Sequence, residues 1–108
     1  MLQNETHIII EIEKPSKKLY TRKGYPTAVL SEAEQQVLDY IQWANAEKEY
    51  LRRRGFPNIG MENIKGLLVI GMRKGLTVRE KEKLAQLNFS ARSTHEIKTF
   101  DDILEENL

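Results

Sequence analysis

Alternating apolar and polar positions near the start of the chain predict a β-strand. Residues 6–13, THIIIEIE, place Ile9, Glu11 and Glu13 on one face of that strand. The opposite face carries the isoleucines Ile8, Ile10 and Ile12. Because both faces are apolar where the strand begins, we expect a position inside a sheet, and Pro15 ends the strand.

Helical spacing of apolar residues predicts helices further along the chain. Capping boxes mark two helix starts, Ser31 with Glu34 and Thr77 with Glu80. We expect the first helix to run to about residue 53 and the second to about residue 88. The residues expected to face inward are Ala33, Val37, Ile41 and Ala44 in the first helix and Val78, Leu84 and Leu87 in the second.

Further apolar segments complete an alternating order of strands and helices. Residues 66–71, GLLVIG, form a continuous apolar run that indicates a buried strand, and residues 96–100, EIKTF, indicate another. A short last helix is expected to begin at Thr99 or Asp101. Its inward-facing residues are expected to be Ile103 and Leu104. The order strand-helix-strand-helix-strand-helix favours an α/β fold with a mostly parallel sheet.

Composition excludes several classes of protein. The length of 108 residues suits one small domain, and 17 basic against 16 acidic residues leave no overall charge that points to a partner. Cysteine is absent, which excludes disulfides and thiolate metal sites. The first residues lack a basic, apolar leader, and no later apolar run is long enough to cross a bilayer. We therefore expect a cytoplasmic protein with no membrane partner.

The two glutamates at the end of the first strand are the first candidate for chemistry. Strand alternation puts Glu11 and Glu13 on one face, with side chains roughly 6–7 Å apart. At the carboxyl edge of a parallel sheet, where ligands gather, such a pair suits a divalent cation, and Mg²⁺ accepts one or two carboxylates with waters and phosphates. The alternative is that both side chains are simply solvated at a strand end.

The segment after this strand is strongly basic. Between residues 14 and 30 there are five basic residues and no acidic one, with Tyr20 and Tyr25 interleaved. The basic residues are Lys14, Lys17, Lys18, Arg22 and Lys23. Such a loop suits a phosphate backbone and an unstacked base, and Arg73 and Lys74 could join its rim. A flexible, solvated loop is the alternative.

Gln36 and the two histidines are weaker candidates for a functional site. Gln36 and Tyr40 lie four residues apart, hence on one helical face, and Gln36 borders the apolar stripe, from which its amide could reach the sheet. A surface glutamine is the alternative reading. His7 and His95 form no motif, so we expect structural or surface roles for both.

Taken together, three blocks of sequence resemble the nuclease domain of the Shedu anti-phage defence proteins, within the PD-(D/E)xK nuclease superfamily. The blocks are IIIEIEKPSKKLYTRKGYPTAVLSEAEQQVLDY, GLLVIGMRKGLTVREKEKLAQLN and EIKTFDDIL. The resemblance implies a restriction-endonuclease-like, three-layer fold and DNA hydrolysis with Mg²⁺ or Mn²⁺. By the same resemblance, Glu11 matches the metal-binding glutamate, and Gln36 matches a glutamine that some branches place beside the active site.

The chain also departs from the superfamily pattern. Glu13 stands where a lysine is usual, so it would act as a metal ligand or a general base instead. The strand that usually precedes this one, with its aspartate, is missing from the sequence. We therefore expect residues 1–108 to form the C-terminal portion of a PD-(D/E)xK fold with an incomplete core. Its open strand edge would pair with another copy or with a missing N-terminal segment.

These observations give three hypotheses. The first is a metal-dependent DNA endonuclease-like domain of an anti-phage system, with Glu11, Glu13 and Gln36 in the site. Its DNA-binding residues would be Lys14, Lys17, Lys18, Arg22, Lys23 and Arg73. The second is a catalytically incomplete nucleic-acid-binding or assembly module derived from such a nuclease. The third is a small α/β interaction domain without a nucleic-acid role.

Overall fold

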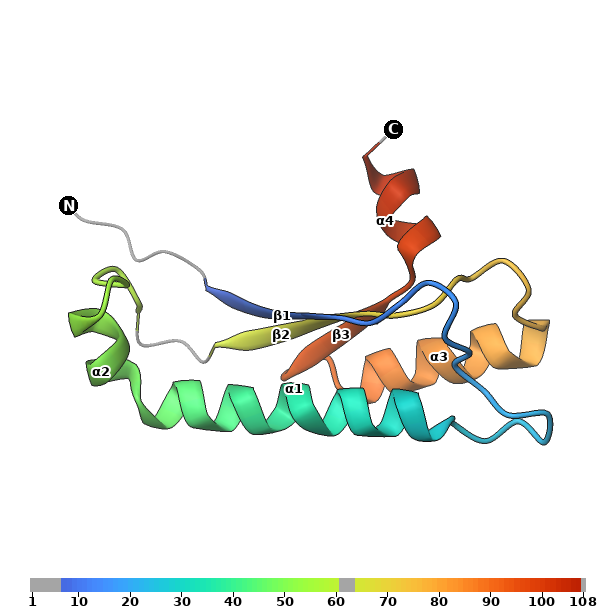
Figure 1. Ribbon diagram of the computed structural model, residues 1–108, viewed down its shortest axis with the longest axis horizontal. Helices are drawn as coiled ribbons and strands as arrows, with labels where there is room; N and C mark the ends of the chain where they lie inside the picture. The colour runs from blue at the N-terminus through green and yellow to red at the C-terminus, as the bar shows by residue number, and fades with distance from the viewer. Residues whose placement is uncertain (1–6, 61–63, 108) are drawn as a thin grey trace.

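A three-stranded parallel sheet forms the centre of the molecule (Figure 1). The computed structural model describes residues 7–60 and 64–107. The strands are β1 (Ile8–Ile12), β2 (Lys65–Val69) and β3 (His95–Lys98), and the helices are α1 (Ala28–Ala46), α2 (Lys48–Arg53), α3 (Val78–Ser90) and α4 (Phe100–Glu106). This confirms the predicted α/β class, parallel sheet and short, incomplete core.

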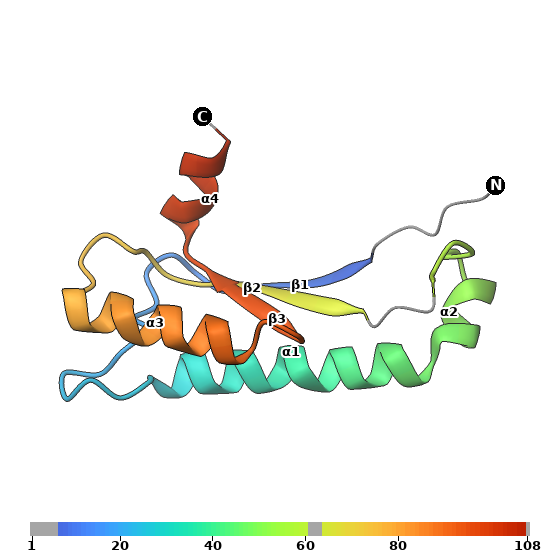
Figure 2. The same cartoon turned by 180° about the vertical axis from the view of Figure 1, so that it is seen from behind.

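The helices are distributed unequally over the two faces of the sheet. α1 and α3 lie along one face, whereas α4 stands on the other side at the end of β3 (Figures 1 and 2). The main core lies between the sheet and α1. Its buried members are Leu19, Tyr20, Leu30, Ala33, Val37, Ile41, Leu68, Ile70, Leu84 and Ile97. The layer opposite α1 and α3 is therefore represented by α4 alone among the described residues.

β1 lies at the edge of the sheet in the described part of the chain, not inside it as its two apolar faces suggested. The expectation of an open edge is confirmed instead. Ile8, Ile10 and Ile12 are 55%, 57% and 64% exposed, because they point away from α1. Only the other face of β1, with Ile9, packs against the core. Residue 6, which was expected to begin this strand, lies outside the described residues.

The start of α1 differs from the sequence prediction. The helix begins at Ala28, where the hydroxyl of Thr27 accepts a hydrogen bond from the Leu30 amide at 3.2 Å. The capping box expected at Ser31 is therefore wrong, because the chain is already helical there, and Glu34 contacts His95 instead. The single helix expected to reach about residue 53 is divided at Glu47 into α1 and α2.

The two later helices that were predicted begin where the sequence indicates. The Thr77–Glu80 box is present at the start of α3, and Thr99 caps α4 in a second box with Asp102. Leu84 is buried as expected. The inward positions predicted for Val78 and Leu104 are wrong, since each is about two-thirds exposed or more. Val78 is the first residue of α3, and α4 packs against only the end of the sheet.

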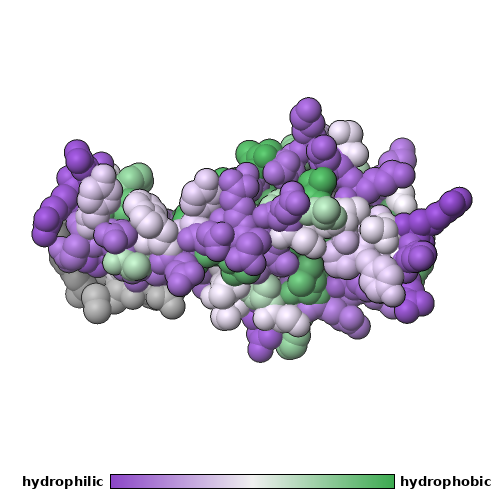
Figure 3. Space-filling view, turned by 60° about the horizontal axis from the view of Figure 1, so that its bottom comes forward, coloured by the Kyte–Doolittle hydropathy of each residue, from purple (hydrophilic) through white to green (hydrophobic). Residues whose placement is uncertain are grey.

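The outer surface of the helical layer is polar. Figure 3 shows this face covered mainly by hydrophilic side chains, with small apolar areas between them. Hydrophilic side chains also project from the end of the molecule where the loops before α1 and α3 lie.

Candidate functional site

β1 holds the two candidate carboxylates on one side, as strand alternation predicts. Glu11 lies opposite Leu68 of β2, and the amide of Glu13 donates to the carbonyl of Val69 at 2.8 Å, which continues the parallel ladder past Ile12. Glu11 and Glu13 are both partly buried, whereas the intervening Ile12 is exposed. Both glutamates therefore share the face of β1 that is turned toward the helical layer, at the carboxyl end of the sheet.

Gln36 lies on α1, on the stripe that borders β1. Its side-chain amide donates to the hydroxyl of Tyr40 at 3.3 Å, so the predicted pairing on one helical face is present. Trp43, one turn further along this stripe, lines an apolar hollow together with Ile8 and Ile9 of β1. No hydrogen bond in the described part of the chain links Gln36 to either glutamate. Gln36 is exposed on α1, and no contact joins it to the carboxylates among the described residues.

The carboxylate pair is chemically suited to a hard divalent cation. Carboxylate oxygens are the donors that Mg²⁺ and Mn²⁺ prefer, and Mg²⁺ commonly takes only one or two protein carboxylates. Neither Glu11 nor Glu13 forms an ion pair with another described residue, so both could accept a cation. Within residues 7–60 and 64–107, however, no three His, Cys, Asp or Glu side chains converge on one point. A metal held here would complete its coordination with water or with substrate oxygens.

The basic loop between β1 and α1 is anchored rather than loose. Leu19 and Tyr20 are buried in the core, and Tyr20 forms a bridge with Pro26. Within this turn, the amide of Thr21 donates to the carbonyl of Tyr25 at 2.7 Å. Burial leaves Tyr20 unable to stack on a base, whereas Tyr25 is 66% exposed and could do so.

The environment of Tyr20 also keeps its hydroxyl protonated. Burial raises the pKa of Tyr20 above its ordinary value of 10.0, and the nearby carboxylates of Glu80 and Glu34 raise the pKa further. The phenol is therefore a neutral group of the core. Its contribution to the site is to fix the loop that carries the cationic residues.

A second loop, between β2 and α3, packs closely against the basic loop. The amide of Gly71 donates to the carbonyl of Lys14 at 3.3 Å. A Cβ at Gly71 would lie 2.5 Å from the carbonyl oxygen of Lys17, and Gly71 has φ +66°, so glycine is required on both counts. This contact fixes the distance between the two loops at the carboxyl end of the sheet.

Between these loops lies a basic groove of about 860 Å³. We use the term basic groove for the hollow lined by cationic side chains from both loops, namely Lys17, Lys18, Arg22 and Lys74. Thr77 and Glu80, at the start of α3, lie on its border. Three of the expected DNA-contacting residues are thus brought together.

The other expected DNA-contacting residues do not line the basic groove. Lys14 and Lys23 lie on the same loop outside its walls. The guanidinium of Arg73 lies 4.0 Å from the carboxylate of Asp102, on the side of α4. Of the two neighbours expected at the rim, Lys74 lines the basic groove and Arg73 does not, and sequence alone gives no sign of which one faces the basic loop.

His95 has the structural role that the sequence predicts. It is 5% exposed, its Nε2 lies 2.9 Å from a carboxylate oxygen of Glu34, and its Nδ1 lies 2.8 Å from the Thr94 hydroxyl. These contacts connect β3 to α1 and satisfy both ring nitrogens. His95 is therefore part of the scaffold that supports the site from the opposite end of the sheet.

Comparison with known proteins identifies the family of the chain. No curated protein matches the sequence. None of the helices in the described residues is long and apolar enough to cross a membrane. Residues 1–104 match the family described as Shedu protein SduA, C-terminal. This match covers nearly the whole sequence, and the chain therefore belongs to the family of Shedu SduA C-terminal regions.

Proposed function

We propose that this chain is a DNA-processing domain that acts in anti-phage defence. Membership of the Shedu family supports the defence role. We propose further that the basic groove binds the sugar-phosphate backbone and that Glu11 and Glu13, which lie at the same end of the sheet but do not line the groove, take part in phosphodiester hydrolysis. The observation that carries the proposal is the convergence of four cationic side chains at the sheet end where β1 presents Glu11 and Glu13.

The charges of the basic groove are available to an anion. Among the described residues, none of its four cations forms an ion pair, in contrast to Arg73 and Lys98, which contact acidic groups. Neighbouring like charges repel one another, so a row of unpaired cations suits a polyanion. Each phosphate that such residues neutralise releases counterions, which is the main source of sequence-independent affinity for nucleic acid.

Glu11 and Glu13 are the residues that would hold Mg²⁺ or Mn²⁺. When bound, such an ion would polarise the phosphodiester and lower the pKa of an attacking water. Glu13 adds a negative charge where a lysine is usual in the superfamily, so the cations of the groove would have to balance charge on the substrate. Gln36 is a candidate for orienting this site, since it lies on the α1 stripe beside β1.

A second candidate function is DNA binding without hydrolysis. It is favoured by Glu13 in place of lysine and by the lack of a three-ligand cluster among the described residues. In this case the chain would be a nucleic-acid-binding or assembly module of the defence protein.

A cleavage assay separates the two functions. Supercoiled and linear DNA are incubated with the wild-type chain and with Glu11→Gln, in Mg²⁺, Mn²⁺ or EDTA. Hydrolysis predicts cleavage that needs the metal and falls at least about a hundredfold in Glu11→Gln, as for loss of a group that stabilises charge during reaction. Glu32→Gln, at an exposed position of α1, is the matched control and should cleave normally. Salt-sensitive binding with no cleavage in either metal would support the second function and reject hydrolysis by this chain.

The exposed face of β1 supports the further expectation that a second copy of the chain covers it. Ile8, Ile10 and Ile12 form an apolar row on the edge strand of the described sheet. Contiguous apolar surface of this kind commonly marks an interface, and an open edge offers unpaired backbone groups to another strand.

A further inference from the structure

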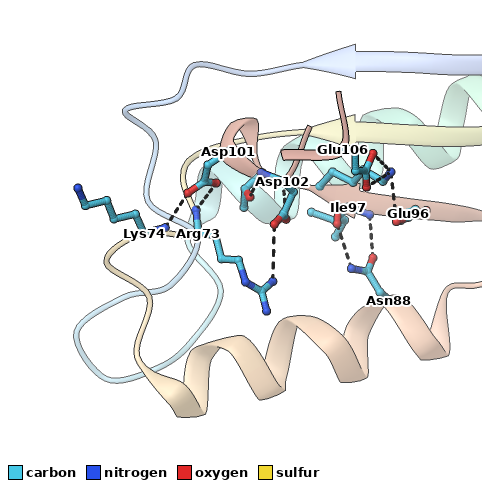
Figure 4. Close-up of polar contacts among 10 residues, drawn as sticks. Arg73, Lys74, Asn88, Glu96, Ile97, Asp101, Asp102 and Glu106 are labelled. Carbon is cyan, nitrogen blue, oxygen red and sulfur yellow. Dashed lines mark hydrogen bonds and ion pairs between the residues drawn. The ribbon is translucent and has the colours of Figure 1, made fainter. Parts of the chain in front are cut away.

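One carboxylate outside the basic groove holds the backbone of the loop that forms one of its walls. The two oxygens of Asp101 accept hydrogen bonds from the backbone amides of Arg73 at 2.8 Å and Lys74 at 2.9 Å (Figure 4). Asp101 belongs to the first turn of α4, 27 residues further along the chain than Lys74. A bidentate contact to consecutive amides fixes both the position and the orientation of this loop segment.

The rest of α4's first turn fixes Asp101 itself. Thr99 is fully buried and caps the helix, and the amide of Phe100 donates to the carbonyl of Gly71 at 2.9 Å. Gly71 is the residue that packs against the basic loop. The carboxylate of Asp101 is thus attached to a rigid support that contacts both ends of the segment from Gly71 to Lys74.

The two hydrogen bonds to the Asp101 carboxylate, which we call the tether, hold a loop segment in which the side chains of Arg73 and Lys74 point apart. The guanidinium of Arg73 extends toward Asp102 on α4, whereas the ammonium-bearing chain of Lys74 extends away from α4 (Figure 4) and lines the basic groove. Arg73 begins a tight turn that contains Lys74 and is closed by the hydrogen bond from the Leu76 amide to the Arg73 carbonyl at 3.0 Å. The two side chains leave this turn in different directions, and the contacts with Asp101 hold both of its amides in that arrangement.

We propose that Asp101 is a positioning residue for nucleic-acid binding, which acts by holding Lys74 in the wall of the basic groove. This inference rests on the proposed function of the groove. In this role Asp101 does not contact the nucleic acid itself. Because Asp101 belongs to α4, the helix would support the groove as well as cover the end of the sheet.

A positioning role and a simple charge effect of Asp101 predict opposite changes in DNA affinity when its charge is removed. A carboxylate close to a DNA-binding groove repels phosphate, so its neutralisation should strengthen binding. The tether predicts that Asp101→Asn weakens binding, because the amide retains one acceptor oxygen and presents an N–H group to a backbone N–H. The direction of the effect therefore distinguishes positioning from a general charge effect.

The test measures the affinity of the chain for a short DNA duplex as a function of salt. The variants are Asp101→Asn, Lys74→Ala, their double variant, and Glu105→Gln as the matched neutralisation on α4. We expect Asp101→Asn and Lys74→Ala each to weaken binding about fivefold at low salt and to reduce the salt slope by about one phosphate contact. The double variant should bind like Lys74→Ala alone, and Glu105→Gln should bind at least as tightly as the wild type.

Stability is checked in parallel so that loss of folding is not mistaken for loss of positioning. If Asp101→Asn is unfolded at the assay temperature, Asp101→Ser takes its place, with the same expected direction. Additive effects of Asp101→Asn and Lys74→Ala, or tighter binding by Asp101→Asn, would overturn the positioning role while leaving the groove's function intact. Absence of salt-dependent binding by the wild type would instead overturn the proposed function, and this inference with it.

Discussion

Gly66 is the residue that lets α1 approach the sheet most closely. A Cβ at this position would lie 2.5 Å from Cγ1 of Val37 and 2.8 Å from Cδ1 of Ile41. Contacts this short require the backbone or the neighbouring side chains to move. The glycine in the centre strand therefore sets the spacing of the layer that carries Gln36.

We predict that Gly66→Ala destabilises the fold by about 1–3 kcal/mol, the usual cost of overpacking a core. Thermal or denaturant unfolding measures the change. In a Val37→Ala background the same substitution should cost less, because the deleted methyl groups make room for the new Cβ. Equal costs in both backgrounds would show that the contact with Val37 is not the source of the strain.

Asp101 gives a prediction for the dependence of stability on pH. Burial alone would raise its pKa, but hydrogen bonds from the Arg73 amide, the Thr99 side chain and the Lys74 amide lower the pKa from 3.8 to about 2. A lowered pKa in the folded state means that the carboxylate stabilises the fold above pH 3.8 and that this stabilisation is lost as the pH falls toward about 2.

The free energy of unfolding of the wild type should therefore exceed that of Asp101→Asn by about 1–2 kcal/mol near neutral pH, as expected for hydrogen bonds to a charged group. The difference should shrink as the pH falls below about 4 and be largely lost as the pH falls through about 2. Urea titrations at several pH values measure it. A difference that stays constant across this range would contradict the ionised state of Asp101.

For single residues, the sequence predicts the chemical character of the loop after β1 better than it predicts where each side chain lies. It shows that the loop after β1 is basic, and three of its cations do line the groove. It does not show that Tyr20 is buried or that Lys74, and not Arg73, lines the groove. Both depend on residues far along the chain, since Tyr20 packs in a core cluster that includes Ile97 and the Lys74 amide is held by Asp101, and no local pattern reports such contacts.

At the scale of elements, two asparagines complete the hydrogen bonding of strand backbone. Asn88 of α3 contacts Ile97 of β3, donating to its carbonyl at 2.9 Å and accepting from its amide at 2.7 Å (Figure 4). Asn45 of α1 makes the equivalent pair of contacts with Ile64, just before β2. Each asparagine therefore replaces a missing neighbour strand at one backbone position.

We predict that Asn88→Ala destabilises the fold by about 1–3 kcal/mol, because it leaves the backbone groups of the buried Ile97 without partners. Asn88→Asp should be at least as harmful, since it replaces the donor with a second acceptor facing a carbonyl. Chemical denaturation measures both. Gln86→Ala, on the exposed side of the same helix, serves as the control and should be nearly neutral.

Periodicity predicts the type and order of the elements well, but not their ends. The Thr77 cap is found because an acidic residue, Glu80, follows it at the third position. Thr99, one of the two starts predicted for the last helix, caps α4 in the same way with Asp102. At α1 the same rule selects Ser31, yet Thr27 is the cap, with no acidic residue in the first turn. A capping threonine that has no glutamate or glutamine three residues later is harder to recognise in a sequence than a complete capping box.

At the scale of the whole molecule, the sheet has one covered and one largely open face. α1 and α3 bury the side that carries Ile9 and Leu68, and α4 reaches only the end of the other side. The sequence predicts the parallel sheet and its open edge, but three isoleucines in a row also suggest burial. Burial requires a covering layer, and a strand's own pattern cannot reveal whether that layer belongs to the same chain.

If a second copy covers this face, sedimentation analysis should show self-association that rises with concentration. Ile10→Lys should reduce it at least about tenfold by placing a charge in the apolar row. The matched substitution Gln42→Lys, on the exposed face of α1, should leave it unchanged. A wild-type chain that stays monomeric at all concentrations would reject pairing between copies.

The central claim is that the basic groove binds nucleic acid through its backbone. The most direct measurement compares the DNA affinity of Lys18→Ala/Lys74→Ala with that of Arg53→Ala/Lys65→Ala, which removes the same charge away from the groove. We predict that the groove variant loses about two units of salt slope and at least tenfold in affinity at low salt, whereas the control changes little. Equal losses in both variants, or no loss in the groove variant, would contradict it.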